Sequence, residues 1–287
     1  MSMDRRSFVL LSSMVAAGGL KPEVRAASPS QSEPRPGLRT ITYNVLVFHG
    51  FKKTDDNKHV LAQARSQMAR RIALELALHQ PDIVTFQESP SEKKVAEVAT
   101  LLDMNYAYFR GGFPGTIMTR HEILESTNCP LVEGTRPKDL FTRHWGRAVI
   151  QREEGELVVF TAHLHPGKVE VREREVTEML KVMQVDRDAG RTILFQGDLN
   201  HKPDGPEYPR WVAAGLVDSF AAKGSGQPLT IPSTTPNKRI DYIWASADLA
   251  SRVSECRVLF EGAFRTNPED TRSFALSDHI PVLAVFE

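Results

Sequence analysis

The stretch RTILFQGDLN, residues 191–200, decides what kind of fold this sequence forms. Its first half is apolar and rich in β-forming residues, which predicts a buried strand. The run then breaks at a glycine and places Asp198 and Asn200 two residues apart in the loop that follows. Because Asp and Asn are common in turns, the stretch alone fits either a tight turn or a functional site.

Further strands of this kind alternate with helices along the chain. Helical patterns are expected at 60–81, 91–103 (with Ser91 as N-cap), 168–188 and 208–216. Strands are expected at 39–48, 82–88, 115–120, 191–200, 239–246, 255–262 and 281–287, with a hairpin at 146–164 that turns at 153–156. Since hairpins occur among the interleaved elements, we expect an α/β fold with mixed sheets. No break in composition divides residues 39–287, so we expect one domain there.

The composition is that of an ordinary globular protein. The 287 residues are 41% hydrophobic and 25% charged, and 36 basic residues balance 36 acidic ones. A net charge of zero argues against tight, nonspecific binding of polyanions, which needs many Lys and Arg contacts to phosphates. No feature indicates a stable protein partner. The two cysteines, Cys129 and Cys256, show no zinc-binding spacing, and the sequence leaves their pairing open.

The N-terminus differs from the rest of the chain. Residues 1–26 hold an arginine pair, Arg5-Arg6, before a short apolar stretch, and they resemble a bacterial twin-arginine export signal. The apolar stretch is too short to cross a bilayer as a helix, so no integral membrane segment is expected in the mature chain. Residues 27–38 have the Pro/Ser content of a linker. We therefore expect a periplasmic or secreted protein; the alternative is a cytosolic protein with an amphipathic start.

Polar residues stand where many of these strands begin or end. Any one of them has an ordinary explanation, such as a core histidine or a turn aspartate. Their number along one chain instead predicts a cleft at the rim of a sheet. Carboxylate and amide oxygens favour Mg²⁺ or Mn²⁺, and a histidine beside a carboxylate stabilises negative charge. These groups suit the hydrolysis of phosphate esters. The residues are Asn44, Glu88, His163, His165, Asp198, Asn200, Asp241, Asp278 and His279.

The motifs around these residues resemble the endonuclease/exonuclease/phosphatase superfamily, also called DNase I-like. The segments TYN, PDIVTFQE, GTIMTR, VVFTAHLHP, FQGDLN, RIDYIW and LSDHIPV occur in that family's order across residues 39–287. The resemblance implies a four-layer αββα sandwich, two mixed β-sheets flanked by helices. It also implies a metal-dependent hydrolase of phosphoric ester bonds.

The resemblance assigns a role to each matching position. It implies that Glu88, Asn44 and Asp278 bind the metal. The expected catalytic residues are Asp198, which would prepare the attacking water, with Asn200, His279, Asp241 and His163 around the phosphate. Arg143, His144, Trp145 and Arg147 of the segment RHWGR form a candidate anion-contacting cluster; the alternative is an exposed entry to a strand. We expect Arg147 and His165 to bind substrate. The segment HKPD, residues 201–204, has no assigned role and is expected to contribute specificity.

The natural substrate stays open at this point. A phosphodiester is expected, from a nucleic acid, a phospholipid head group or a small molecule. The alternatives are a phosphomonoesterase acting on inositol or sugar phosphates, or a non-catalytic binding protein on the same fold. A zinc hydrolase is a further alternative, prompted by His163 and His165 together with His201.

Overall fold

Strand β1 (Leu38–Asn44) lies in the middle of the first of two sheets, and six of its seven residues are buried. In the computed structural model, which describes residues 37–287, it pairs in parallel with β2 and antiparallel with β13. The predicted signal peptide at 1–26 lies outside the described residues. The predicted linker at 27–38 does too, apart from its last two residues, and β1 already begins at Leu38.

The first sheet has seven strands in the order β10-β12-β13-β1-β2-β4-β3. The bounds of the other six strands are β2 Ile83–Gln87, β3 Asn105–Phe109, β4 Gly115–Thr119, β10 Gly224–Ser225, β12 Val253–Val258 and β13 Val282–Phe286. The second sheet has six strands in the order β5-β6-β7-β8-β11-β9. Their bounds are β5 Glu122–Asn128, β6 His144–Arg152, β7 Gly155–His163, β8 Thr192–Asp198, β9 Leu216–Asp218 and β11 Asp241–Ser246.

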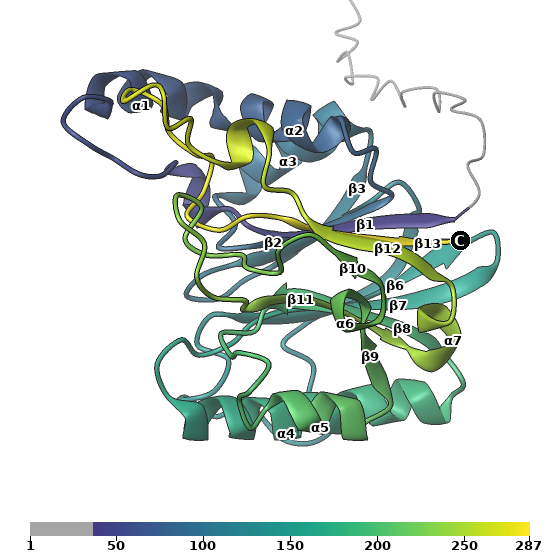
Figure 1. Ribbon diagram of the computed structural model, residues 1–287. Coiled ribbons are helices and arrows are strands. Elements are labelled where there is room, and N and C mark those ends of the chain that lie inside the picture. Colours follow the sequence, from purple (N-terminus) through teal and green to yellow (C-terminus); the bar gives the residue numbers. More distant parts are fainter. Residues whose placement is uncertain (1–36) are drawn as a thin grey trace, which may run out of the picture. The chain divides into compact units, whose positions relative to one another are not determined.

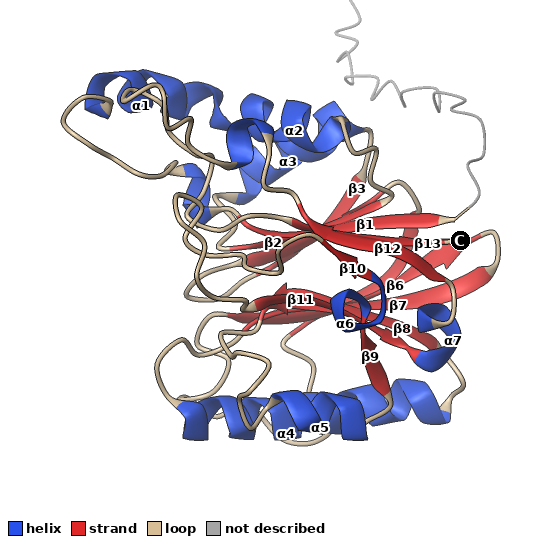
Figure 2. Ribbon diagram, in the orientation of Figure 1, coloured by secondary structure: helices blue, strands red, loops and turns tan. Residues whose placement is uncertain are grey.

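Helices cover the outer face of each sheet, as Figures 1 and 2 show. The helices α2 and α3 lie over the first sheet, and α4 and α5 lie over the second. The helices are α1 Lys58–Ala64, α2 Met68–Ala77, α3 Glu92–Leu102, α4 Val169–Asp188, α5 Tyr208–Ala213, α6 Ser219–Lys223 and α7 Ala247–Ala250, with 3-10 turns at Leu46–Phe48, Arg65–Gln67 and Gly262–Phe264. This order of layers confirms the predicted αββα sandwich.

Two apolar cores hold the layers together. One lies between the sheets and under α2 and α3, and the other lies between the second sheet and α4 and α5. Buried polar pairs also join the sheets: the Thr40 hydroxyl donates to Gln196 Oε1 at 2.8 Å, and Gln87 Nε2 donates to Thr161 at 3.3 Å. Since an unpaired polar group would be costly in such a core, these pairs fix how one sheet lies on the other.

Some predicted boundaries were wrong. The helix expected at 60–81 is broken by the 3-10 turn between α1 and α2, and Ser91 stands at the N-cap of α3 without a side-chain cap bond. The strand expected at 39–48 ends at Asn44. Leu46, Val47 and Phe48 then take positive φ angles of 46°, 51° and 62°, which branched and bulky residues rarely adopt. Asn44 Oδ1 and the Glu88 carbonyl hold this turn by accepting backbone N–H bonds.

Three further observations concern the edge strands, the cysteines and the helices. Strands β3, β5, β9 and β10 were not predicted, and they are the four edge strands of the two sheets. β5 exposes most of its residues, so it lacks the apolar pattern of a buried strand. Cys129 and Cys256 are both free thiols. Between residues 37 and 287, no helix has both the length and the apolar character needed to cross a membrane.

Candidate active site

Most of the predicted site residues meet at one end of the sandwich because the strands that carry them begin or end there. In the second sheet, Asp198 closes β8 and pairs with His163 at the end of the parallel strand β7. Its other neighbour is Asp241, the first residue of the antiparallel strand β11. In the first sheet Asn44 closes β1, beside the end of β2. The loop before β13 brings His279 to the same end, since β13 is antiparallel to β1.

Asp198 lies at the centre of this cluster and is 1% exposed. Its Oδ2 accepts a hydrogen bond from Asn44 Nδ2 at 3.0 Å and lies 3.3 Å from His163 Nε2. Its Oδ1 accepts the backbone N–H of Asn200 at 3.1 Å. Burial raises the pKa of Asp198 above its ordinary value, and the nearby charge of His279 opposes that rise. A carboxylate with a raised pKa is a stronger base than an exposed aspartate.

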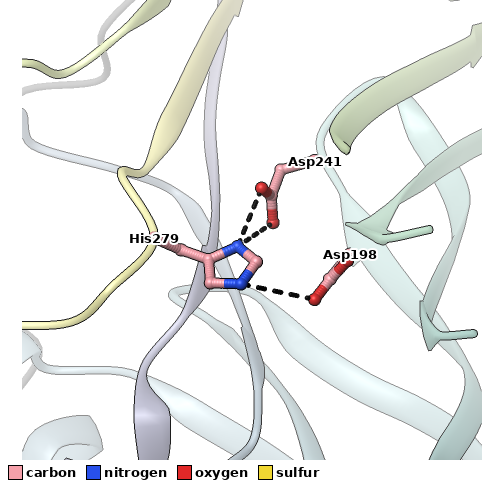
Figure 3. Close-up of side chains that lie close together, drawn as sticks. All are labelled: Asp198, Asp241 and His279. Carbon is pink, nitrogen blue, oxygen red and sulfur yellow. Dashed lines mark hydrogen bonds and ion pairs between the residues drawn. The ribbon is translucent and has the colours of Figure 1, made fainter. Parts of the chain in front are cut away.

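His279 and Asp241 form a buried pair beside Asp198 (Figure 3). His279 Nδ1 lies 2.9 Å and 3.2 Å from the two Asp241 oxygens, and its Nε2 lies 3.7 Å from Asp198 Oδ2. Burial alone would lower the pKa of His279, but Asp241 and then Asp198 outweigh it and raise that pKa to about 10. The imidazole is therefore held in its cationic form, with Nε2 directed toward the centre of the site.

Two sets of residues could hold a metal ion. Ligand atoms of Asp198, Asp241 and His279 lie within 4.8 Å of one another. A protonated imidazole has no lone pair to give a metal, however, so this trio is better suited to handling charge and protons. The second set is Glu88, Asn44 and Asp278, which the sequence analysis predicted.

The second set offers only oxygen ligands and lies next to Asp198. Asn44 Nδ2 lies 3.5 Å from Glu88 Oε1, and the Ser277 hydroxyl donates to the Asn44 carbonyl and also lies 3.3 Å from Asp278 Oδ1. Burial raises the pKa of Glu88; the Asn44 bond opposes that rise, and the charge of Asp278 adds to it. A hard divalent cation bound by Glu88 and Asp278 would offset both the burial of Glu88 and its repulsion by Asp278. The residues therefore fit Mg²⁺ or Mn²⁺.

Two buried histidines line the site from the second sheet. His144, which opens β6, pairs with His163, and their ring centroids lie 6.2 Å apart. Burial lowers the pKa of His144 to about 3 and that of His163 well below its usual range, so both rings stay neutral. Among the described residues, His144 Nε2 and His163 Nδ1 are buried without a hydrogen-bond partner. Such atoms commonly receive a ligand or a water.

Arg143 is the cation at the mouth of this cluster. Its guanidinium lies 4.7 Å from the centre of the Phe113 ring, and that ring lies 6.2 Å from His163. Its Nε is buried and has no hydrogen-bond partner among residues 37–287. The loop that carries Phe113 packs tightly against it, since a Cβ at Gly111 would lie 1.6 Å from the Arg143 carbonyl oxygen. The positive charge of Arg143 opposes, as a small contribution, the rise that burial causes in the pKa of Glu88.

The prediction that Arg147 binds substrate needs correction. Successive side chains of a strand alternate between its faces, so His144 and Arg147, three positions apart in β6, point to opposite faces. His144 faces the site, whereas Arg147 faces α4. There it donates to Asp186 at 2.8 Å and 2.7 Å and to Glu125 at 2.8 Å, with 7% of its surface exposed. Arg143 and His144 belong to the same predicted cluster, and the alternation of side chains along the strand separates His144 from Arg147.

Two other histidines lie outside the cluster. His165 follows β7, and its Nδ1 accepts the backbone N–H groups of Gly167 and Lys168 at 3.2 Å and 3.1 Å. Its role in substrate binding stays a prediction. His201 is buried, receives the indole N–H of Trp211 at 3.1 Å, and has a pKa lowered by burial to about 4. His201 therefore belongs to the packing under α5 and not to a three-histidine zinc site.

Comparison with known proteins agrees with this architecture. A family model described as "Endonuclease/Exonuclease/phosphatase family" matches residues 41–279. No curated protein sequence matches the chain. A mannosyl-6-phosphatase from Bacteroides thetaiotaomicron superposes with a TM-score of 0.70 at 20% identity, over 87% of this chain and 100% of that one. An endonuclease/exonuclease/phosphatase family protein from the same organism gives 0.68 at 20% identity, over 88% and 95%.

A third solved structure is that of a nucleic-acid complex. TDP2 from D. rerio, complexed with single strand DNA product, superposes with a TM-score of 0.63 at 19% identity, over 88% of this chain and 100% of that one. At these identities the likeness to solved structures shows a shared fold and nothing finer about the substrate.

Proposed function

This chain belongs to the endonuclease/exonuclease/phosphatase family, and we propose that it hydrolyses phosphate esters with the help of a divalent metal ion. The observation that carries the proposal is the environment of Asp198. This buried carboxylate lies within 3.7 Å of an amide, a neutral imidazole and a cationic imidazole from three other segments of the chain. The two imidazoles distinguish it from Asp218, a buried aspartate of the fold that accepts from an arginine, a tyrosine and backbone N–H groups.

Asp198 is the group that receives the proton of the attacking water. Its hydrogen bonds from Asn44 and from the backbone of Asn200 fix the direction of its two oxygens. Asn200 is itself held in a positive-φ conformation of 53°, with its side chain donating to the Leu164 carbonyl at 3.0 Å. Because this second layer of bonds prevents rotation, the carboxylate is oriented before substrate binds.

Cationic groups face the space beside Asp198. His279 is kept charged by Asp241, and its Nε2 is directed to where phosphate oxygens would gain negative charge. Arg143 offers a second positive charge at the mouth of the site. Glu88, Asn44 and Asp278 would hold the metal ion. When bound, the ion supplies Lewis-acid polarisation of the phosphoryl oxygens and neutralises charge in the transition state.

A phosphodiester is the preferred substrate in this proposal, and a phosphomonoester is the second candidate. The similarity to a mannosyl-6-phosphatase is the observation that favours a monoester. The two are separated by comparing bis(p-nitrophenyl) phosphate with p-nitrophenyl phosphate at equal concentration. A higher kcat/KM for the first supports a diesterase.

The proposal is tested by metal dependence and by one conservative substitution. We expect hydrolysis with Mg²⁺ or Mn²⁺, no hydrolysis in EDTA, and a loss of about 10²-fold or more in kcat for Asp198→Asn. Asp56→Asn is the matched control, since Asp56 is exposed on a loop. Absence of turnover on every ester, or full activity in Asp198→Asn, would refute the proposal. The first result would favour the alternative of a non-catalytic binding protein.

Export of the protein is part of the same proposal. The twin-arginine pattern of residues 1–26 supports a periplasmic or secreted location. We expect residues 1–38 to export a fused reporter from bacteria with a twin-arginine translocase and not from a strain that lacks it. Export that survives replacement of both Arg5 and Arg6 by Lys would contradict this route.

A further inference from the structure

A cavity of about 330 Å³ opens beside the candidate active site. Its wall includes Asn200, the residue that fixes Asp198, and Ile240, the residue before Asp241. Most of the remaining wall is the segment 201–207, which contains the HKPD stretch for which the proposed reaction has no use. The cavity therefore adjoins the strands that carry two of the central carboxylates.

Charged side chains stand among apolar ones in the wall. Lys202 and Lys238 are exposed, and within residues 37–287 neither ammonium group has an ion pair or a hydrogen bond. Asp204 adds an acceptor at the rim. No Phe, Tyr or Trp side chain lines the cavity. Donors and acceptors without an aromatic surface suit a compact group with several hydroxyls better than a flat base, which gains most from stacking.

A second, independent observation points to a ligand. Glu207 is fully buried and pairs through Oε1 with Arg172 Nε at 2.6 Å. Its other oxygen, Oε2, has no hydrogen-bond partner among the described residues. The Gly205 backbone approaches that oxygen closely, because a Cβ there would lie 2.8 Å from Oε2. An unpaired carboxylate oxygen in a cavity wall is costly unless a donor such as a hydroxyl reaches it.

We infer that this cavity binds the alcohol portion of the substrate, and that this portion is a sugar or polyol. The inference rests on the proposed function, since it concerns the same ester. Lys202 and Lys238 donate to the hydroxyl oxygens, and Asp204 and Glu207 accept from the hydroxyl groups. The segment 201–207 thus selects the substrate, while Asp198 and His279 act on its phosphate.

Binding of small phosphates tests the inference separately from turnover. Glucose 6-phosphate, phenyl phosphate and thymidine 5′-phosphate are titrated by calorimetry with Mg²⁺ into the Asp198→Asn protein, which hydrolyses them slowly if at all. We expect glucose 6-phosphate to bind at least about tenfold more tightly than the other two, as several hydrogen bonds would give. Lys202→Ala and Lys238→Ala should each weaken it by about threefold to tenfold without affecting phenyl phosphate.

The controls separate a specific site from general attraction by charge. Lys223→Ala removes an exposed lysine of α6 that lies outside the cavity wall, and it should change nothing. Gly205→Ala would place a methyl group against Glu207 Oε2 and displace that oxygen. It should weaken the binding of glucose 6-phosphate alone, provided that the melting temperature of the variant matches that of the parent. The inference is overturned if phenyl phosphate or thymidine 5′-phosphate binds as tightly, or if the lysine variants weaken all three equally. Failure of the proposed function would instead appear as no ester hydrolysis by the parent protein.

Discussion

Replacing Asp241 by Asn separates the two chemical roles open to the trio of Asp198, Asp241 and His279. The substitution keeps the shape of the side chain and removes the charge that faces His279 Nδ1 at 2.9 Å. A hydrogen bond to a charged group contributes about 1.5–3 kcal/mol. Since about 1.4 kcal/mol is a factor of ten in rate, we expect kcat to fall by about 10- to 150-fold.

The dependence of activity on pH should also change in Asp241→Asn. With Asp241 present, the pKa of His279 is raised to about 10, so the cation persists through neutral pH. Without that carboxylate, burial lowers the pKa of the ring, and the alkaline fall in activity should move to lower pH. The assay is the hydrolysis of bis(p-nitrophenyl) phosphate between pH 6 and pH 10 at saturating Mg²⁺, with Asp56→Asn as the matched control.

Two results would refute this reasoning. Unchanged kcat in Asp241→Asn would mean that the charge of His279 does not matter for the reaction. Activity that returns fully at higher Mg²⁺ concentration would make Asp241 a metal ligand, as the compact arrangement of the trio allows. Our account instead predicts an unchanged Mg²⁺ requirement and a KM within about twofold of the parent, because the interaction acts in the transition state.

Three further variants or conditions test other parts of the site. Arg143→Gln should lower kcat/KM by about tenfold, because it removes a charged contact to the phosphate. The control Arg110→Gln, at a solvent-exposed ion pair, should not change kcat/KM. Equal effects of the two substitutions would contradict the role of Arg143. Arg147→Ala should lower the free energy of unfolding in urea by about 3 kcal/mol, the lower end for a broken buried ion pair, because Arg191 still pairs with Asp186. It should leave kcat/KM unchanged. A variant that loses activity but keeps full stability would show that Arg147 binds substrate after all. In the metal-free protein, nitrogen-15 NMR should find His279 protonated from pH 6 to pH 9. Because the pKa of His279 is raised on folding, the stability that its pairing with Asp241 contributes is fully present below about pH 6.5 and is lost as the pH rises through about 10. Titration of His279 near pH 6.5 would refute this pairing.

The alternation of strands and helices and the polar residues at the strand ends follow from local sequence, whereas the four layers were implied by the resemblance of the motifs to a known family. Strands such as β2 and β8 are buried along their whole length or nearly so, and therefore appear as continuous apolar runs that end in polar residues. Where neighbouring strands end at the same rim of a sheet, those polar residues must meet. This is why Asn44, His163, Asp198 and Asp241 were predictable from the sequence.

The remaining parts depend on tertiary contacts. The edge strand β5 has little buried surface, so no apolar pattern marks it. The break between α1 and α2 does not interrupt the spacing of the apolar residues, so hydrophobic periodicity does not reveal it. Arg143 gains its role only through the Phe113 loop, about thirty positions earlier in the chain, which no local motif reveals. Nor does sequence spacing show that the Gly205 backbone packs closely against Glu207 Oε2.

The central claim is that water, prepared by Asp198, attacks phosphorus at this end of the sandwich. It is tested most directly by hydrolysing bis(p-nitrophenyl) phosphate in water enriched in oxygen-18, with Mg²⁺ present. Our account predicts one labelled oxygen in the p-nitrophenyl phosphate released by the parent protein, and at least about 10²-fold slower labelling with Asp198→Asn. Label in the p-nitrophenol, or equal labelling rates in the two proteins, would contradict it.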